Sequence, residues 1–187
     1  LLYIAMKLSE SESTLFFNLY HPLLLFANQQ YPVINDVFTV DGLRKKSSEQ
    51  LSALRQVLYQ YPILFDQFVA ANPFHFLPHE LELIKSWQRW IVGRFFIFRE
   101  TNYYTIFLSN IRPIRAYAVL ALNSRFSEIF AASLPVYVET ALLPFRDKII
   151  ADGIFSYFRL QFSHGFIRKL HQSYMEAIDH EGIITSL

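Results

Sequence analysis

Hydrophobic positions recur at helical spacing through the first half of the chain. A capping-box motif at residues 9–12 precedes a run of apolar positions at Leu15, Phe16, Leu19, Tyr20 and Leu23. This pattern predicts a first helix, which we expect to kink or restart near His21 because Pro22 lacks an amide donor. Residues 28–41 are predicted to be a loop. Further helices are expected at 42–59 or 48–59, through 65–69 and from Pro78 onward.

After Trp87 the pattern becomes that of strands. Residues 93–99 and 103–109 are rich in Phe, Tyr, Ile and Thr, and the polar residues 100–102 between them indicate a hairpin. The pattern then predicts a third strand at 116–122 completing a meander, a short helix at 124–131, a second hairpin from 136–143 and 148–151, a turn at Asp152-Gly153, and a strand at 157–162. A closing helix at 165–180 is expected to bury Phe166, Ile167, Leu170, Tyr174 and Ile178.

Helices followed by strands define the expected fold class as α+β. We predict one domain over residues 1–187, with a helical N-terminal half at 1–86. The sheet-rich part at 87–187 is a mostly antiparallel sheet, meander plus hairpin, with a C-terminal helix. Strand–helix–strand alternation is missing, which argues against a parallel doubly wound sheet.

The composition of the chain bears on its cellular compartment and on membrane association. The chain has no cysteine, which favours the cytoplasm and removes thiolate chemistry. No apolar run reaches the ~18–20 residues that cross a bilayer, so we expect no membrane partner. Residues 1–5 are too short for a signal-peptide core, and Met6-Lys7 is the more natural start. Aromatic residues make up 17% of the chain, with 19 Phe, a surplus that suits either a Phe-rich core or an interface.

A cationic and aromatic block lies in the middle of the chain. Residues 85–125 hold seven basic side chains and one acidic side chain, whereas both flanking parts have a small acidic excess. Cationic stems among aromatic rings suit phosphate chains and stacked bases. The candidate binding residues of the block are Arg89, Arg94, Arg99, Arg112, Arg115, Tyr103 and Tyr104.

The alternation of side chains along a strand determines which residues of this block lie on the same face. In residues 93–99, Arg94 shares a face with Phe96 and Phe98, and Arg99 shares the other face with Phe95 and Ile97. In one interpretation, an arginine is exposed beside aromatic rings, as in proteins that bind single-stranded nucleic acids. The alternative is a central strand buried on both sides, with arginines at its ends reaching solvent.

Catalytic and metal-binding patterns are weak. The pair His75 and His79 has helical spacing, but Pro78 between them marks a helix start, so no metal site or cofactor is expected. A metal-dependent hydrolase using Glu139 and Asp152 is an open alternative, although Asp152-Gly153 suits a turn. Nucleophile elbows and phosphate-binding glycine loops are missing from the sequence. We therefore assign no catalytic residue, and an enzymatic function is disfavoured.

Several segments together carry a family resemblance. The most specific is Leu-Leu-Pro-Phe at 142–145 followed by Ile-Ile-Ala-Asp-Gly at 149–153, and Gly-Ile-Ile-Thr-Ser-Leu ends the chain. With Met-Lys-Leu-Ser at 6–9, this resembles a family of uncharacterised bacterial proteins, in which Tyr usually stands where this chain has Ala151. The resemblance implies a bacterial cytosolic protein and brings no activity or site.

These observations favour a binding protein over an enzyme. The first hypothesis is association with another copy of itself (a homo-oligomer) or with another protein, because the aromatic surplus comes without a catalytic constellation. The second is nucleic-acid binding through residues 85–125.

Overall fold

The computed structural model describes residues 6–131 and 133–187 and has the expected α+β architecture. The chain forms two compact units. Residues 10–89 make the helical unit, and residues 6–9 together with 90–187 make the barrel unit. The boundary lies close to the predicted change from helices to strands, and the helical unit is an insertion between two parts of the barrel unit. The prediction that residues 1–5 are an upstream extension lies outside the described residues.

The helical unit is built around one long helix. Helix α1 packs against each of the four other α-helices of the unit. In chain order the elements are α1 (Glu10–Gln30), α2 (Val40–Arg44), α3 (Ser48–Gln60), α4 (Ile63–Ala71), α5 (Pro78–Ser86) and the 3-10 turn η1 (Trp87–Arg89). The capping box of α3 is formed by Ser47 and Gln50, whose side chains each accept from the other's backbone amide.

Helix α1 does not restart at Pro22, contrary to the sequence-based expectation. It is helical from Glu10 to Gln30, and Pro22 is buried within it. Burial of Leu19, Leu23 and the residues around them offsets the one backbone hydrogen bond that the proline removes. The following loop is held by Asn28, whose side chain bonds the backbone amide and carbonyl of Ile34 at 3.0 and 2.9 Å.

The barrel unit contains the sheet. Its strands are β1 (Ile91–Glu100), β2 (Thr105–Ser109), β3 (Ala116–Leu120), β4 (Val136–Phe145), β5 (Lys148–Ala151), β6 (Ser156–Phe158) and β7 (Ile183–Ile184), with helices α6 (Phe126–Phe130) and α7 (His164–Glu181). The predicted meander and second hairpin are both present, since β1–β2, β2–β3 and β4–β5 are antiparallel pairs. The two-residue strand β7 was not predicted.

Two further pairings close the sheet into a barrel. Strand β1 pairs antiparallel with β4 over most of its length, and β3 pairs in parallel with β5. The closed order is therefore β1–β2–β3–β5–β4–β1, with α6 between β3 and β4 in the chain. This is the connectivity of the five-stranded Greek-key barrel called the OB-fold. Strands β6 and β7 add to the remaining edges of β4 and β3.

The N-terminal segment is part of this barrel. Leu8 donates its amide to the carbonyl of Ala121 at 2.9 Å, and the Ala121 amide donates to the carbonyl of Met6 at 3.1 Å. Leu8 is buried. Residues 6–9 therefore belong to the barrel unit, residues 10–89 form the helical unit, and the chain returns to the barrel unit at Trp90.

The inside of the barrel is the main core of this unit. Inward side chains of alternate strand positions meet there, and Phe126 of α6 packs among them. The buried members of this cluster are Phe95, Ile97, Phe107, Tyr117, Val119, Ala121, Phe126, Val136, Val138, Leu142, Ile149 and Ala151.

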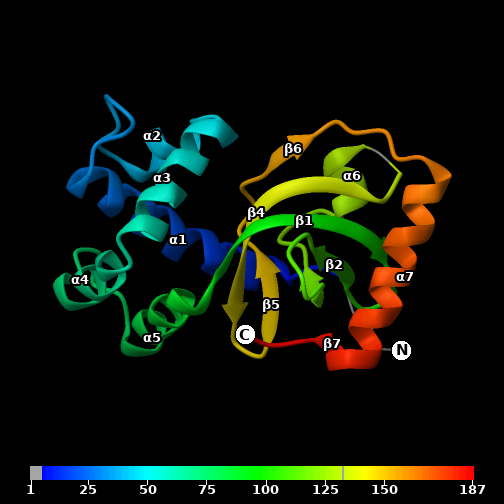
Figure 1. The fold of residues 1–187 in the computed structure, drawn as a ribbon. Helices are drawn as coiled ribbons and strands as arrows, with labels where there is room; N and C mark the ends of the chain where they lie inside the picture. The colour runs from blue at the N-terminus through cyan, green and yellow to red at the C-terminus, as the bar shows by residue number, and fades with distance from the viewer. Residues whose placement is uncertain (1–5, 132) are drawn as a thin grey trace. The chain divides into compact units, whose positions relative to one another are not determined.

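Helix α7 covers the outside of β1, β2 and β3 (Figure 1). Leu170, Tyr174 and Ala177 pack there against outward side chains of the three strands. The prediction that Phe166 and Ile167 are buried was wrong: each is 37% exposed. The buried stripe of α7 begins only at Leu170, so the first turns of the helix keep these two side chains partly in solvent. Among the described helices, none has both the length and the apolar composition needed to span a membrane.

Candidate binding surfaces

A β-bulge changes the faces of β1. The register with β2 shifts between Ile97 and Arg99, so Phe98 is the extra residue. Ile97 points into the barrel, whereas Phe98 packs in the outer cluster under α7. Arg99 also lies on the α7 side, where its guanidinium stands over the Tyr174 ring at 4.7 Å. The prediction that Arg99 shares a face with Ile97 was therefore wrong, because the bulge places two consecutive residues on one side.

Arg94 is engaged with strand β4. Its Nε donates to Glu139 Oε2 at 3.1 Å, and its guanidinium lies 5.0 Å from the centre of the Phe158 ring. This hydrogen bond to Glu139 raises the pKa of Arg94. Half of the side chain remains in solvent. Arg94 is thus a cation whose charge is already balanced by a neighbouring carboxylate.

Arg99 and Arg115 also have partners. The Arg99 guanidinium donates to Tyr174 Oη at 2.9 Å, and Arg115 pairs with Glu181 at 3.2 Å. Burial raises the pKa of Tyr117, an effect that the hydrogen bond and charge of Arg115 oppose. Arg99 therefore ties β1 to the middle of helix α7, and Arg115, directly before β3, is tied to the acidic C-terminal end of that helix.

The remaining predicted binding residues are dispersed. Arg89 is exposed at the end of η1 and belongs to the helical unit. Tyr103 is exposed in the β1–β2 loop, while Tyr104 packs on the cluster under α7. Arg112 is exposed in the β2–β3 loop and forms no ion pair with any residue that the structure describes. The central block thus supplies one unpaired guanidinium beside α7 rather than one continuous cationic surface.

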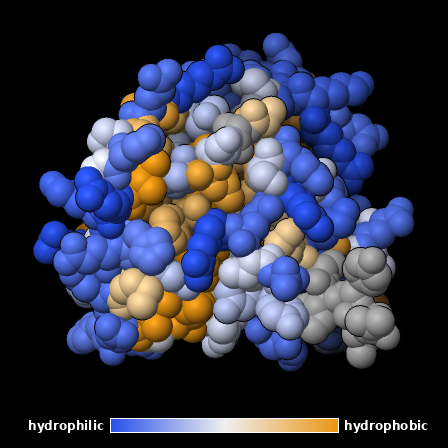
Figure 2. Space-filling view, turned by 90° about the vertical axis from the view of Figure 1, so that its right-hand side faces the viewer, coloured by the Kyte–Doolittle hydropathy of each residue, from blue (hydrophilic) through white to orange (hydrophobic). Residues whose placement is uncertain are grey.

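A row of partly exposed rings crosses the outside of the barrel next to Arg94. We call it the aromatic row; its members are Phe96, Tyr137, Phe158, Phe162 and Phe166. Phe96 contacts Tyr137 at 4.6 Å and Phe166 at 5.6 Å between ring centres. The rings of Phe162 and Phe166 are stacked at 5.0 Å with 14° between their planes. Seen from the side on which α7 lies, hydrophobic side chains gather in the middle of this face among hydrophilic ones (Figure 2).

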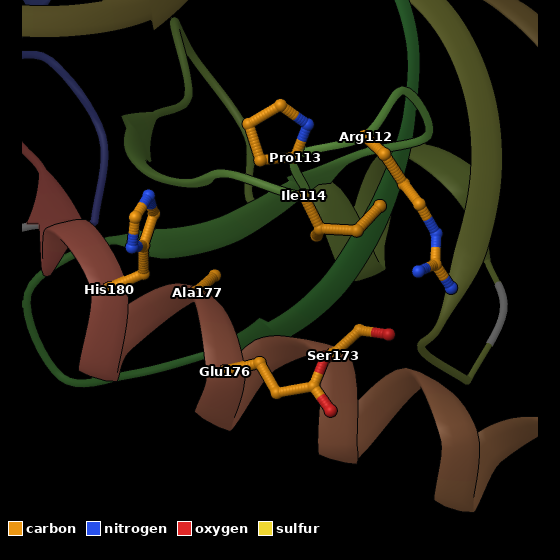
Figure 3. A pocket seen from close by; sticks show the side chains of 7 residues that line it. All are labelled: Arg112, Pro113, Ile114, Ser173, Glu176, Ala177 and His180. Carbon is orange, nitrogen blue, oxygen red and sulfur yellow. The ribbon is translucent and has the colours of Figure 1, made fainter.

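A groove lies beside α7. It has a volume of about 220 Å³ and is formed by the β2–β3 loop on one side and the helix on the other. Figure 3 shows Arg112 reaching along it toward Ser173 and Glu176, away from His180 at the opposite end. Asn110 of the same loop donates to Tyr137 Oη at 2.8 Å, which joins the loop to the aromatic row. The groove and the row therefore share one loop and one helix.

The sequence contains a second cationic and aromatic segment, which was not predicted as a site. Residues 153–175 include no acidic residue but hold Arg159, Arg168 and Lys169 together with six aromatic side chains. The segment supplies three of the five rings of the aromatic row. A search for long stretches without Asp or Glu would have found it, whereas the stretch at 85–125 contains Glu100.

The two carboxylates of the hydrolase hypothesis are not brought together. Glu139 points outward to Arg94. Asp152 is buried, and its Oδ1 accepts from Thr140 Oγ1 and from the Ile154 amide, both at 3.0 Å. Thr140 follows Glu139 in an extended strand, so their side chains lie on opposite faces. Within the described residues, no group of three or more His, Asp and Glu side chains is arranged to hold a metal ion.

The helical unit exposes several large apolar side chains. Phe38 is 80% exposed at the end of the loop that Asn28 holds, beside a pocket of about 640 Å³. Tyr31 and Tyr61 are stacked at 4.1 Å with 3° between their rings. The other large apolar residues of this unit that are at least 40% exposed are Tyr31, Val33, Tyr59, Ile63, Phe74 and Leu77.

Comparisons with family models, with curated proteins and with solved structures find no match to this chain. The OB-type connectivity is therefore a description of the strand order alone, and it does not by itself define a function.

Proposed function

We propose that this protein acts by binding rather than by catalysis, and that it associates with a second copy of itself through the helical unit. The observation that carries the proposal is the exposure of Phe38, which at 80% leaves nearly a whole ring in water. Large aromatic side chains of this kind are typical anchors of protein interfaces. Burying a phenylalanine contributes about 1.5–3 kcal/mol, so covering Phe38 and its neighbours favours association.

The charge of the chain supports association. The whole protein has a formal net charge of +1, so repulsion between copies is weak. The stacked pair Tyr31 and Tyr61 offers a rigid apolar surface with a polar edge, which loses little side-chain entropy on binding. The lack of cysteine supports a cytoplasmic setting, and the sequence resemblance supports a bacterial source.

Light scattering coupled to size exclusion tests this proposal. We expect the mass of the wild-type protein to rise with concentration from the monomer value of 22.0 kDa toward twice that value. Phe38→Ser should shift the protein to monomer, whereas the matched control Tyr103→Ser, at an exposed ring of the barrel unit, should not. A wild-type protein that stays monomeric at every concentration, or equal effects of the two substitutions, would refute the proposal. Association with a different protein alone would also count against it.

A further inference from the structure

We infer that the barrel unit binds a single-stranded nucleic acid along the aromatic row, with bases stacked at Phe162 and Phe166 and phosphates held by Arg112, Arg159 and Lys169. This surface belongs to the barrel unit, so the inference does not depend on self-association through the helical unit. It also differs from the outer face of β2 and β3, where barrels of this connectivity bind ligands, because α7 covers that face here.

The geometry of the rings suits bases. Phe162 and Phe166 already form a stacked pair with nearly parallel rings. Phe166 is 37% exposed, so a base can continue the stack on its solvent side. The inner side of the pair rests on Phe96, which lies in the sheet and contacts both rings at 5.9 and 5.6 Å. The stacked pair is therefore held in place by Phe96 and does not need to become ordered on binding.

The cations around the row are free to meet phosphates. Arg112, Arg159 and Lys169 are exposed and form no ion pair among the described residues, unlike Arg94 and Arg115. Arg159 follows Phe158 directly in the chain, and Lys169 lies one turn after Phe166 on α7. Arg159 and Lys169 are thus close in the chain to rings of the row, and Arg112 belongs to the loop that Asn110 joins to Tyr137. Cations near rings are what a chain of bases and phosphates requires.

The groove beside α7 extends the binding surface for the nucleic acid beyond the rings. Ser173 lies two turns after Phe166, about 10.5 Å along the helix axis, and so on nearly the same side of α7. Arg112 reaches toward Ser173 from the opposite wall (Figure 3). Glu176, Asp179 and Glu181 then make the end of the helix acidic. We therefore expect a short binding site that ends near Ser173, with no cation of α7 beyond it to hold a phosphate.

Two other partners of a cationic and aromatic surface are less suited to this one. An anionic membrane would need several apolar side chains that project together from the surface. Phe96, Tyr137 and Phe158 are only partly exposed and lie against the strands, and the more exposed Leu160 stands apart from the ring contacts of the row. Duplex nucleic acid keeps its bases stacked on one another and offers no free face to Phe166. Stacking without base-edge readout also predicts little sequence preference.

Fluorescence anisotropy with labelled single-stranded oligothymidine and oligouridine, a DNA duplex and phosphatidylserine vesicles tests the inference. We expect binding to one or both single strands that weakens as salt rises, and clearly weaker binding to the duplex and the vesicles. The two oligomers decide whether DNA or RNA is preferred.

Matched variants locate the site. Phe166→Leu keeps an apolar side chain but loses the ring, and should weaken binding about tenfold. Arg159→Gln and Lys169→Gln should each reduce the dependence of log affinity on log salt by about 0.7. The controls Phe74→Leu and Lys45→Gln, exposed in the helical unit, should have no effect on binding. Circular dichroism checks that each variant is folded.

Several results would overturn the inference. They are no binding to either single strand at low salt, equal affinity for duplex, binding to vesicles alone, or unchanged affinity in folded Phe166→Leu and Lys169→Gln proteins. A wild-type monomer that binds the oligomers would refute the proposed self-association but not this site, and a dimer that binds neither would do the reverse.

Discussion

Substitution of Asp152 tests whether this carboxylate has a structural role in the turn at Asp152-Gly153 or a role in a reaction centre. Asp152 is 1% exposed, and its Oδ1 accepts from the Ile154 amide and from Thr140 Oγ1, both at 3.0 Å. Replacing Asp152 by Ala removes the acceptor from a buried amide, which costs about 1–3 kcal/mol. The Thr140 hydroxyl retains a second acceptor at 3.0 Å, the Ile154 carbonyl, so its loss is smaller.

We therefore expect Asp152→Ala to lower the free energy of unfolding of the barrel by about 2 kcal/mol. Asp152→Asn keeps an oxygen that can accept from Ile154 and should cost about half as much. Asp147→Ala, in the exposed turn between β4 and β5, is the matched control and should change stability by less than about 0.5 kcal/mol.

Hydrogen exchange measured by mass spectrometry on peptides from β4 and β5 is the assay, because it reports on the barrel unit even where the helical unit unfolds separately. A loss of about 2 kcal/mol speeds exchange through unfolding roughly thirtyfold. A change below about threefold in Asp152→Ala would refute the reasoning. A carboxylate kept for chemistry gives the opposite pattern, since its removal leaves stability unchanged or raises it.

Two further outcomes can be measured. Burial and the nearby Arg44 guanidinium lower the pKa of His21 from 6.5 to about 4, so the unfolded chain takes up a proton between these values that the folded protein does not. The free energy of unfolding should therefore fall by about 1–2 kcal/mol as the pH drops from 6.5 to 4, a value reduced for partial solvent exposure. Urea unfolding at both ends of this pH range should show that decrease in the wild type and not in His21→Gln. Gly182 ends α7 with φ 79° and ψ −170°, and a Cβ there would meet nothing within 4 Å, so Gly182→Ala should cost about 1–3 kcal/mol through backbone strain alone. Gly165→Ala, in the first turn of the same helix, should be neutral or stabilising by up to about 1 kcal/mol in thermal unfolding, and equal effects at both positions would contradict this account.

The local elements were predictable because each has a clear period. The helix at 48–60 and the hairpins of β1–β2 and β4–β5 follow directly from spacing and turn residues. The closure of the barrel was not predictable in this way. It depends on pairing β1 with β4 and β3 with β5, and such distant registers are set by the packing of whole faces rather than by any local signal.

The errors at the candidate site have the same origin. Alternation along Phe96, Ile97, Phe98 and Arg99 predicts opposite faces for successive residues, and only the partner strand reveals the bulge. Helical spacing likewise groups Phe166 with Leu170, but the buried stripe of α7 starts only at Leu170. The sequence therefore indicates which residues are aromatic and cationic, whereas the surface they form depends on tertiary contacts.

The pairing of the N-terminal segment with Ala121 has a consequence for biosynthesis. Residues 6–9 leave the ribosome on the order of ten seconds before their partner is translated, at ordinary rates of elongation. The complete sequence of the inserted helices emerges within that interval. Residues 6–9 of the nascent chain must therefore stay available for pairing while a whole folding unit is synthesised, until Ala121, directly after β3, has been translated.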